Sequence, residues 1–171
     1  MTVKVLGSLM AVGLTSLLWG CGYAVSVNER VVYTPASLFT DYKLADTLLH
    51  KCVEQSVIDQ QVTQASGLKQ LNCSNAGIQS LAGLEVFTGI EALNLTSNDL
   101  TDVKALASLS QLKIVLLGNN RLQSAAPLLA LLKLEQLDVS ENPTLTCNDL
   151  TQLQRNYAGQ KLSLQKPAQC S

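Results

Sequence analysis

A short repeat of constant length is the feature that most constrains how this chain can fold. Segments that share the pattern apolar-x-x-apolar-x-apolar begin at Leu68, Ile90, Leu112 and Leu134, which gives a 22-residue period. In three of them an asparagine follows three residues after the last apolar position, at Asn98, Asn120 and Asn142. A unit this short cannot bury an apolar face by itself, so the period predicts a stack of repeats that stabilise one another.

Each position of the repeat has a physical role. The last two apolar positions are two residues apart, so they lie on one face of a short strand while the residue between them faces outward. The asparagine amide can pair with backbone groups where the chain turns inward. Further along, apolar residues at intervals of three, such as Leu81, Leu84 and Phe87, predict a short helical return segment. The first repeat has Ala76 in place of the asparagine, which is typical of a terminal repeat.

The flanks of the repeats predict a cap at each end. Before the repeats, three- and four-residue spacings predict an amphipathic helix, with Thr40 or Asp41 as its N-cap. Its apolar residues are Leu38, Phe39, Leu44, Ala45, Leu48, Leu49 and Cys52. After the repeats, residues 148–153 continue the last return segment, and we expect Leu162, Leu164 and Cys170 to fold over the final strand.

From about Phe39 to Leu153 the chain resembles the 22-residue leucine-rich repeats of bacterial internalins and similar surface or periplasmic proteins. The match includes the pattern L-x-x-L-x-L-x-x-N-x-L, the cap segment Phe39–Ala45, and the return segment Leu100–Leu106. The resemblance implies an α/β solenoid of about four repeats with parallel strands on the concave face. It also implies an N-terminal helical cap, a C-terminal cap, and a concave face that binds a protein partner.

The N-terminus predicts export. A short positive start ending at Lys4 precedes an apolar stretch of about fourteen residues, Val5–Leu18, shorter than the roughly 20 that span a bilayer. Leu18, Gly20 and Cys21 then resemble the lipobox of bacterial lipoproteins, although Trp19 departs from its usual small residue. The resemblance implies that Cys21 is acylated, and several acyl chains give stable anchoring. Gly22 is not the aspartate that retains such proteins at the inner membrane, so an outer-membrane location is expected.

These features divide the chain into five parts. Residues 1–20 are predicted to be a cleaved lipoprotein signal peptide, and residues 21–36 a lipid-anchored spacer. Residues 37–67 form the predicted helical cap, residues 68–153 the repeats, and residues 154–171 the C-terminal cap. We expect the protein in the bacterial cell envelope, facing the periplasm or the cell surface.

Besides Cys21, four cysteines lie beyond the predicted leader, and each of two pairs flanks one end of the repeat array. They are Cys52, Cys73, Cys147 and Cys170. In an exported protein these cysteines can form disulfides, and three pairings of the four are possible. The spacing favours Cys52–Cys73 and Cys147–Cys170, each closing a loop of about twenty residues and worth roughly 3 kcal/mol. The alternative is that Cys73 and Cys147 fill inward-facing positions as free thiols.

The sequence contains few candidate catalytic residues. Its single histidine, His50, excludes a site with several histidine ligands and leaves little for a histidine-based triad. Asp138 and Glu141 are close carboxylates that strand alternation turns outward, which predicts solvated side chains. No glycine-rich phosphate-binding loop occurs, and the net charge of -1 does not suit nucleic acid. We therefore expect a protein that is not an enzyme and binds no metal or cofactor.

The outward strand positions supply a candidate binding surface. Most of them are polar, but Ile114 and Leu116 place aliphatic groups there, and Gly118 beside them would permit close approach of a partner. With Asn94 and Asp138 on the neighbouring strands, these residues predict a site for a protein partner. Two alternatives stay open: exposed aliphatic residues are common on monomers, and the chain could be a structural envelope lipoprotein that packs or self-associates without a specific ligand.

Overall fold

The computed structural model describes residues 25–27, 30–33 and 36–170 in two compact units that divide after Ala36. In the first unit, β1 (Val25–Val27) and β2 (Arg30–Tyr33) pair antiparallel within the segment predicted to be a spacer. Both strands are rich in valine, which favours strands. The predicted signal peptide and Cys21 lie outside the described residues. Within the described part of the chain, no helix is long and apolar enough to cross a membrane.

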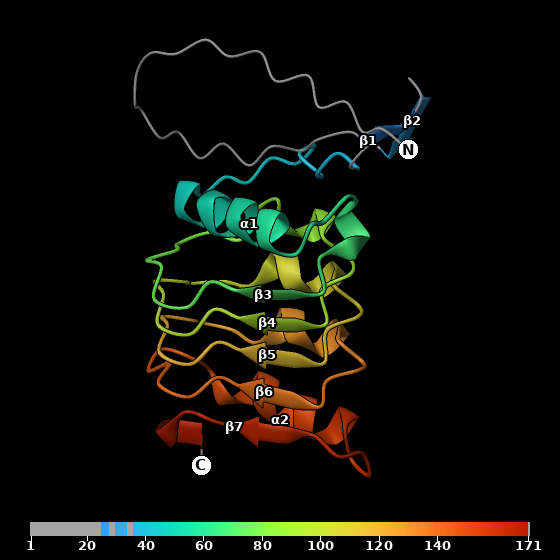
Figure 1. The fold of residues 1–171 in the computed structure, drawn as a ribbon. Helices are drawn as coiled ribbons and strands as arrows, with labels where there is room; N and C mark the ends of the chain where they lie inside the picture. Colours follow the sequence, from blue (N-terminus) through green and yellow to red (C-terminus); the bar gives the residue numbers. More distant parts are fainter. Residues whose placement is uncertain (1–24, 28–29, 34–35, 171) are drawn as a thin grey trace. The chain divides into compact units, whose positions relative to one another are not determined.

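The second unit contains a parallel sheet of five strands over its described residues. The strands are β3 (Gln70–Asn72), β4 (Ala92–Asn94), β5 (Ile114–Leu116), β6 (Gln136–Asp138) and β7 (Ser163–Gln165). They stack in chain order, as Figure 1 shows. From β3 to β6 the register advances by the 22-residue period, so that Gln70 pairs with Ala92 and Ala92 with Ile114. The repeat period therefore sets the strand register.

Strand β7 comes from the region predicted only as a C-terminal cap. Gln136 pairs with Ser163, which is a longer step along the chain than the repeat period. The step is longer because the preceding return segment is a true helix, α2 (Cys147–Asn156), whereas the earlier repeats return through short 3₁₀ turns. The predicted boundary between repeats and cap, after residue 153, falls inside α2.

The core lies between the strands and the return segments. The central strand residues and one leucine of each return segment are buried: Leu71, Leu93, Val115, Leu137, Leu84, Leu106, Leu128 and Leu150. The return segments before α2 are 3₁₀ turns at Leu84–Val86, Lys104–Ser108 and Ala126–Ala130. Because every layer presents similar aliphatic side chains at the same place, each repeat buries its face against the next.

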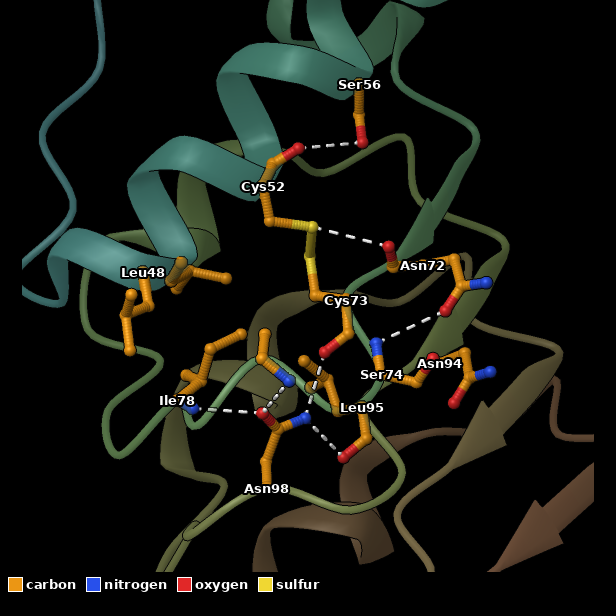
Figure 2. Close-up of a disulfide and its surroundings, with 12 residues drawn as sticks. Leu48, Cys52, Ser56, Asn72, Cys73, Ser74, Ile78, Asn94, Leu95 and Asn98 are labelled. Carbon is orange, nitrogen blue, oxygen red and sulfur yellow. Dashed lines mark hydrogen bonds between the residues drawn. A yellow bond between two sulfur atoms is a disulfide. The ribbon is translucent and has the colours of Figure 1, made fainter.

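A ladder of buried asparagines satisfies the backbone where the chain turns inward. The amide nitrogen of Asn98 donates to the carbonyl oxygens of Cys73 (2.9 Å) and Leu95 (2.8 Å), and its oxygen accepts from the N–H of Ile78 (2.9 Å), as Figure 2 shows. Asn120 and Asn142 make the same three kinds of contact one and two repeats later. Each asparagine therefore joins two adjacent repeats.

The predicted start of the cap helix is wrong. Helix α1 (Thr47–Asp59) has Asp46 as its N-cap, not Thr40 or Asp41. One oxygen of Asp46 accepts from the N–H of Leu48 (2.8 Å), and the other accepts from the N–H of Gln79 (2.8 Å) in the first repeat. Burial alone would raise the pKa of this carboxyl, but four backbone N–H groups outweigh it and lower the pKa. Asp46 thus caps α1 and holds it to the repeats.

The residues ahead of α1 pack without forming a helix. Residues 37–46 are all described and contain no helical residue. The N–H of Phe39 donates to the carbonyl of Val62 (2.8 Å), and the rings of Phe39 and Tyr42 lie 5.9 and 5.1 Å from that of Phe87. The apolar spacing of these residues is typical of one buried face of a helix. Here an irregular segment packs the same residues, through contacts with Phe87 and Val62.

Disulfides fasten both ends of the solenoid. Cys52 in α1 is bonded to Cys73 beside β3, as Figure 2 shows, and Cys147 at the start of α2 is bonded to Cys170. This is the pairing that the spacing favours. The bonds span 21 and 23 residues, so each contributes roughly 3 kcal/mol in the chain-entropy model.

We predict that Asn120→Ala lowers the free energy of unfolding by about 3 kcal/mol. The substitution leaves the buried N–H of Leu100 and two carbonyls without their partner, and each unpaired buried group costs roughly 1–3 kcal/mol. Urea denaturation measures the change. Gln123→Ala, at an exposed side chain in the same repeat, is the control and should change stability by less than about 0.5 kcal/mol. Equal losses of unfolding free energy in the two variants would contradict a stabilising role for the asparagine ladder.

Candidate functional site

The candidate site is the strand face, meaning the surface formed by the outward positions of β3–β7. Strand pairing arranges these positions in two rows across the sheet. The first row is Gln70, Ala92, Ile114, Gln136 and Ser163, and the second is Asn72, Asn94, Leu116, Asp138 and Gln165. Strand β5, at the centre of the sheet, thus places two large aliphatic side chains among mainly polar ones. The structure brings Ile114 and Leu116 together as the sequence predicts.

Leu116 departs from a local hydrogen-bonding pattern that the residues at its position in the other three repeats follow. The side-chain oxygens of Asn72, Asn94 and Asp138 each accept from the N–H two residues later, at 3.2, 3.0 and 2.8 Å. Such short-range bonds favour Asn and Asp where a strand ends in a turn. The leucine side chain has no hydrogen-bond acceptor, so Leu116 does not make this bond with the N–H of Gly118. Local structure therefore does not account for a leucine at this position.

The two aliphatic side chains border a hollow on the strand face. The hollow has a volume of about 390 Å³ and is lined by β3–β5 and by the C-terminal end of α1. The small side chain of Ala92 leaves room between Ile114 and the α1 wall, where Ser56 and Asp59 line the hollow. Gln60 fixes this wall, because its amide nitrogen donates to the carbonyl of Gln70 (2.8 Å). The hollow thus combines aliphatic side chains, Ile114 and Leu116 among them, with polar and acidic ones.

Gly118, predicted to permit close approach of a partner, has a packing role in the structure. It is buried, and a Cβ at this position would lie 3.2 Å from both the Oδ2 of Asp138 and the Oγ of Ser140. Its missing side chain therefore makes room for the next repeat. Asp138 also accepts a hydrogen bond from the hydroxyl of Ser140 (2.6 Å) and stays half-buried beside Leu116, as does Asn94 on the other side.

A row of alternating charges borders the strand face, and the sequence reasoning missed it. Lys69, Glu91, Lys113 and Glu135 each precede a strand and follow the 22-residue period, which was the signal that could have revealed them. Glu91 contacts Lys113 (2.7 Å) and Lys69 (3.6 Å). The hydrogen bond from Lys113 lowers the pKa of Glu91, and the same bond raises the pKa of Lys113. These exposed pairs hold the lysines at the border.

The single histidine, His50, lies apart from the hollow. The ring of His50 packs 5.5 Å from that of Tyr42 in the N-terminal cap, away from the hollow's lining. Over the described residues, no group of three or more His, Cys, Asp or Glu side chains could hold a metal ion.

Comparisons with known proteins bear on the fold. Against solved structures, the chain matches an internalin (inlF) of Listeria monocytogenes with a TM-score of 0.60 and 24% identity, over 73% of this chain and 37% of that one. It matches internalin C2 (inlC2) of the same organism with a TM-score of 0.61 and 20% identity, over 77% and 62%. The chain thus spans less than two thirds of either internalin. The fold is an internalin-like leucine-rich-repeat solenoid. No family model and no curated protein matches the sequence.

We predict that Leu116→Asn leaves this solenoid as stable as before, within about 1 kcal/mol. Asparagine restores the acceptor for the Gly118 N–H that the other repeats have, and one such bond is worth about 1 kcal/mol. The reverse substitution, Asn94→Leu, removes the acceptor of Thr96 and should cost about 1 kcal/mol. Thermal unfolding of both variants measures the contrast. A large loss for Leu116→Asn would mean that this leucine is a packing residue.

Proposed function

We propose that the protein is a non-catalytic interaction module that binds a protein partner on the strand face. The observation that carries the proposal is the aliphatic pair on β5. Ile114 is exposed, with 37% of its surface accessible, and Leu116 stands where the local structure favours an acceptor side chain. A leucine that the fold does not require indicates selection for something outside the fold.

The surroundings of the pair have the composition of a protein interface. Interfaces combine an apolar centre with a polar rim, and their energy is concentrated in a few desolvated anchors. On the strand face, Ile114 and Leu116 would form the centre, and Asn72, Asn94 and the charged row would form the rim. The internalin-like fold supports this proposal at the level of architecture.

A lipid anchor is the second part of the proposal. It rests on the sequence Leu18-Trp19-Gly20-Cys21 after an apolar stretch, which resembles a lipobox. Acylation of Cys21 would hold the module in the bacterial envelope, with the outer membrane as its proposed location. There it would display the strand face to the periplasm or to the cell surface.

Photo-crosslinking in cells tests the binding site. A photoreactive residue at Ile114 should form one defined adduct with a protein, and Leu116→Asn in the same chain should abolish it. A probe at Ala107, which is exposed on a return segment, is the control and should give no such adduct. No adduct at Ile114, or equal adducts at both probes, would contradict the proposed site and favour a structural packing role.

Metabolic labelling with a clickable fatty acid tests the anchor. We predict that the unchanged chain incorporates the label and sediments with membranes, because acyl chains partition into the bilayer. Cys21→Ser should lose both properties, while the neighbouring control Gly22→Ala keeps them. Label retained in Cys21→Ser would place the modification elsewhere, and no label in the unchanged chain would exclude it.

A further inference from the structure

A second aliphatic side chain departs from the repeat pattern, on the rim of the solenoid ahead of β6. Leu132 has 74% of its surface exposed, more than any other large hydrophobic residue among those described. The residues at its position in the preceding repeats, each one period apart, are Ser66, Thr88 and Ser110. Those short hydroxyl side chains are also exposed, so the repeat does not require a large apolar side chain at this position.

We propose that Leu132 of one copy of this chain occupies the hollow at Ile114 and Leu116 of a second copy. The inference rests on the proposed function, because it uses the same strand face and names its occupant. It brings together the two positions where the repeats replace a polar side chain with leucine. One is a projecting side chain, and the other borders a hollow of about 390 Å³ that both apolar and polar residues line.

Charge complementarity supports a copy of this chain as the occupant. Leu132 is followed by Lys133, which is exposed and whose ammonium group donates to the side chain of Gln111 (2.8 Å). The receiving surface has Asp59 in the wall of the hollow and Asp138 beside Leu116. Across the described part of the chain, the ion pairs within 4.0 Å involve neither of these carboxylates. An apolar side chain with a neighbouring cation is therefore the chemistry that this surface fits.

The ends of the solenoid disfavour the other route to self-association, which is pairing of sheet edges. At β3 the edge is covered by α1, which the Cys52–Cys73 bond holds in place. At β7 the strand is three residues long and lies between Lys161 and Lys166, and lysines beside a short edge strand oppose pairing with another chain. Contact through the rim and the strand face avoids both obstacles.

The proposed contact uses different surfaces on its two copies. Such a heterologous contact gives each copy a donor side, Leu132, and an acceptor side, the hollow. One leucine and one cation make a small interface, so the association is weak and depends on protein concentration. Anchoring many copies on one membrane would raise their local concentration.

The test separates donor from acceptor by co-expressing two forms of the full-length chain in cells. The donor has a photoreactive residue at Ala130, which is exposed near Leu132, and the acceptor has an affinity tag. We expect a tagged donor–acceptor adduct in which the probe is joined to residues lining the hollow. Leu116→Asn in the acceptor alone should reduce it at least tenfold, and the same change in the donor alone should leave it intact.

Reciprocal variants and a matched control complete the test. Leu132→Ser restores the side chain found at this position in other repeats. In the donor it should abolish the adduct, and in the acceptor it should have no effect. Val86→Ser removes another exposed aliphatic group, on the return segment Leu84–Val86, and should have no effect in either copy. No donor–acceptor adduct, or one that responds equally whichever copy is changed, overturns the inference.

The outcome is distinguishable from failure of the proposed function. If the probe at Ile114 captures a different protein and the Ala130 probe captures no second copy, the binding module stands and self-association is excluded. If the probe at Ile114 captures nothing, both proposals fail.

Discussion

The structure depends on pairing the backbone where each repeat turns inward. A solenoid that closes a turn in every repeat leaves N–H and carbonyl groups inside it, and a buried unpaired group is costly. Asn98, Asn120 and Asn142 satisfy these groups across two repeats at once. Because each amide needs the preceding repeat at a fixed distance, the ladder and the strand register impose the same period on the chain.

A short stack has two exposed ends for few interior layers, so much of this chain serves as cap. Asp46 joins α1 to the first repeat, and at the other end Asp149 in α2 accepts from the hydroxyl of Ser124 (2.7 Å) and the N–H of Ala125 (2.9 Å). A disulfide reinforces each end. Similar carboxylate contacts therefore fix a helix at both ends of the solenoid.

Repetition makes departures from the pattern informative. In a repeated structure the same position meets nearly the same environment in each layer, so its usual residue reports what the fold requires. Leu116 and Leu132 replace side chains that are polar in the other repeats, whereas Gly118 proves to fit Asp138 and Ser140 of the next layer. The comparison between layers thus separates residues that maintain the fold from residues that suggest binding.

The sequence by itself determined the repeats, the buried positions, the aliphatic pair on β5 and the preferred cysteine pairing, because these depend on periodicity and spacing. Only the tertiary structure decided the start of α1, the fifth strand and the role of Gly118. Apolar spacing in residues 38–52 suits a helix or an irregular packed segment equally, and contacts with Phe87 settle which forms. Strand β7 breaks the period because α2 lengthens its repeat, and the space beside Gly118 exists only once Asp138 and Ser140 are in place.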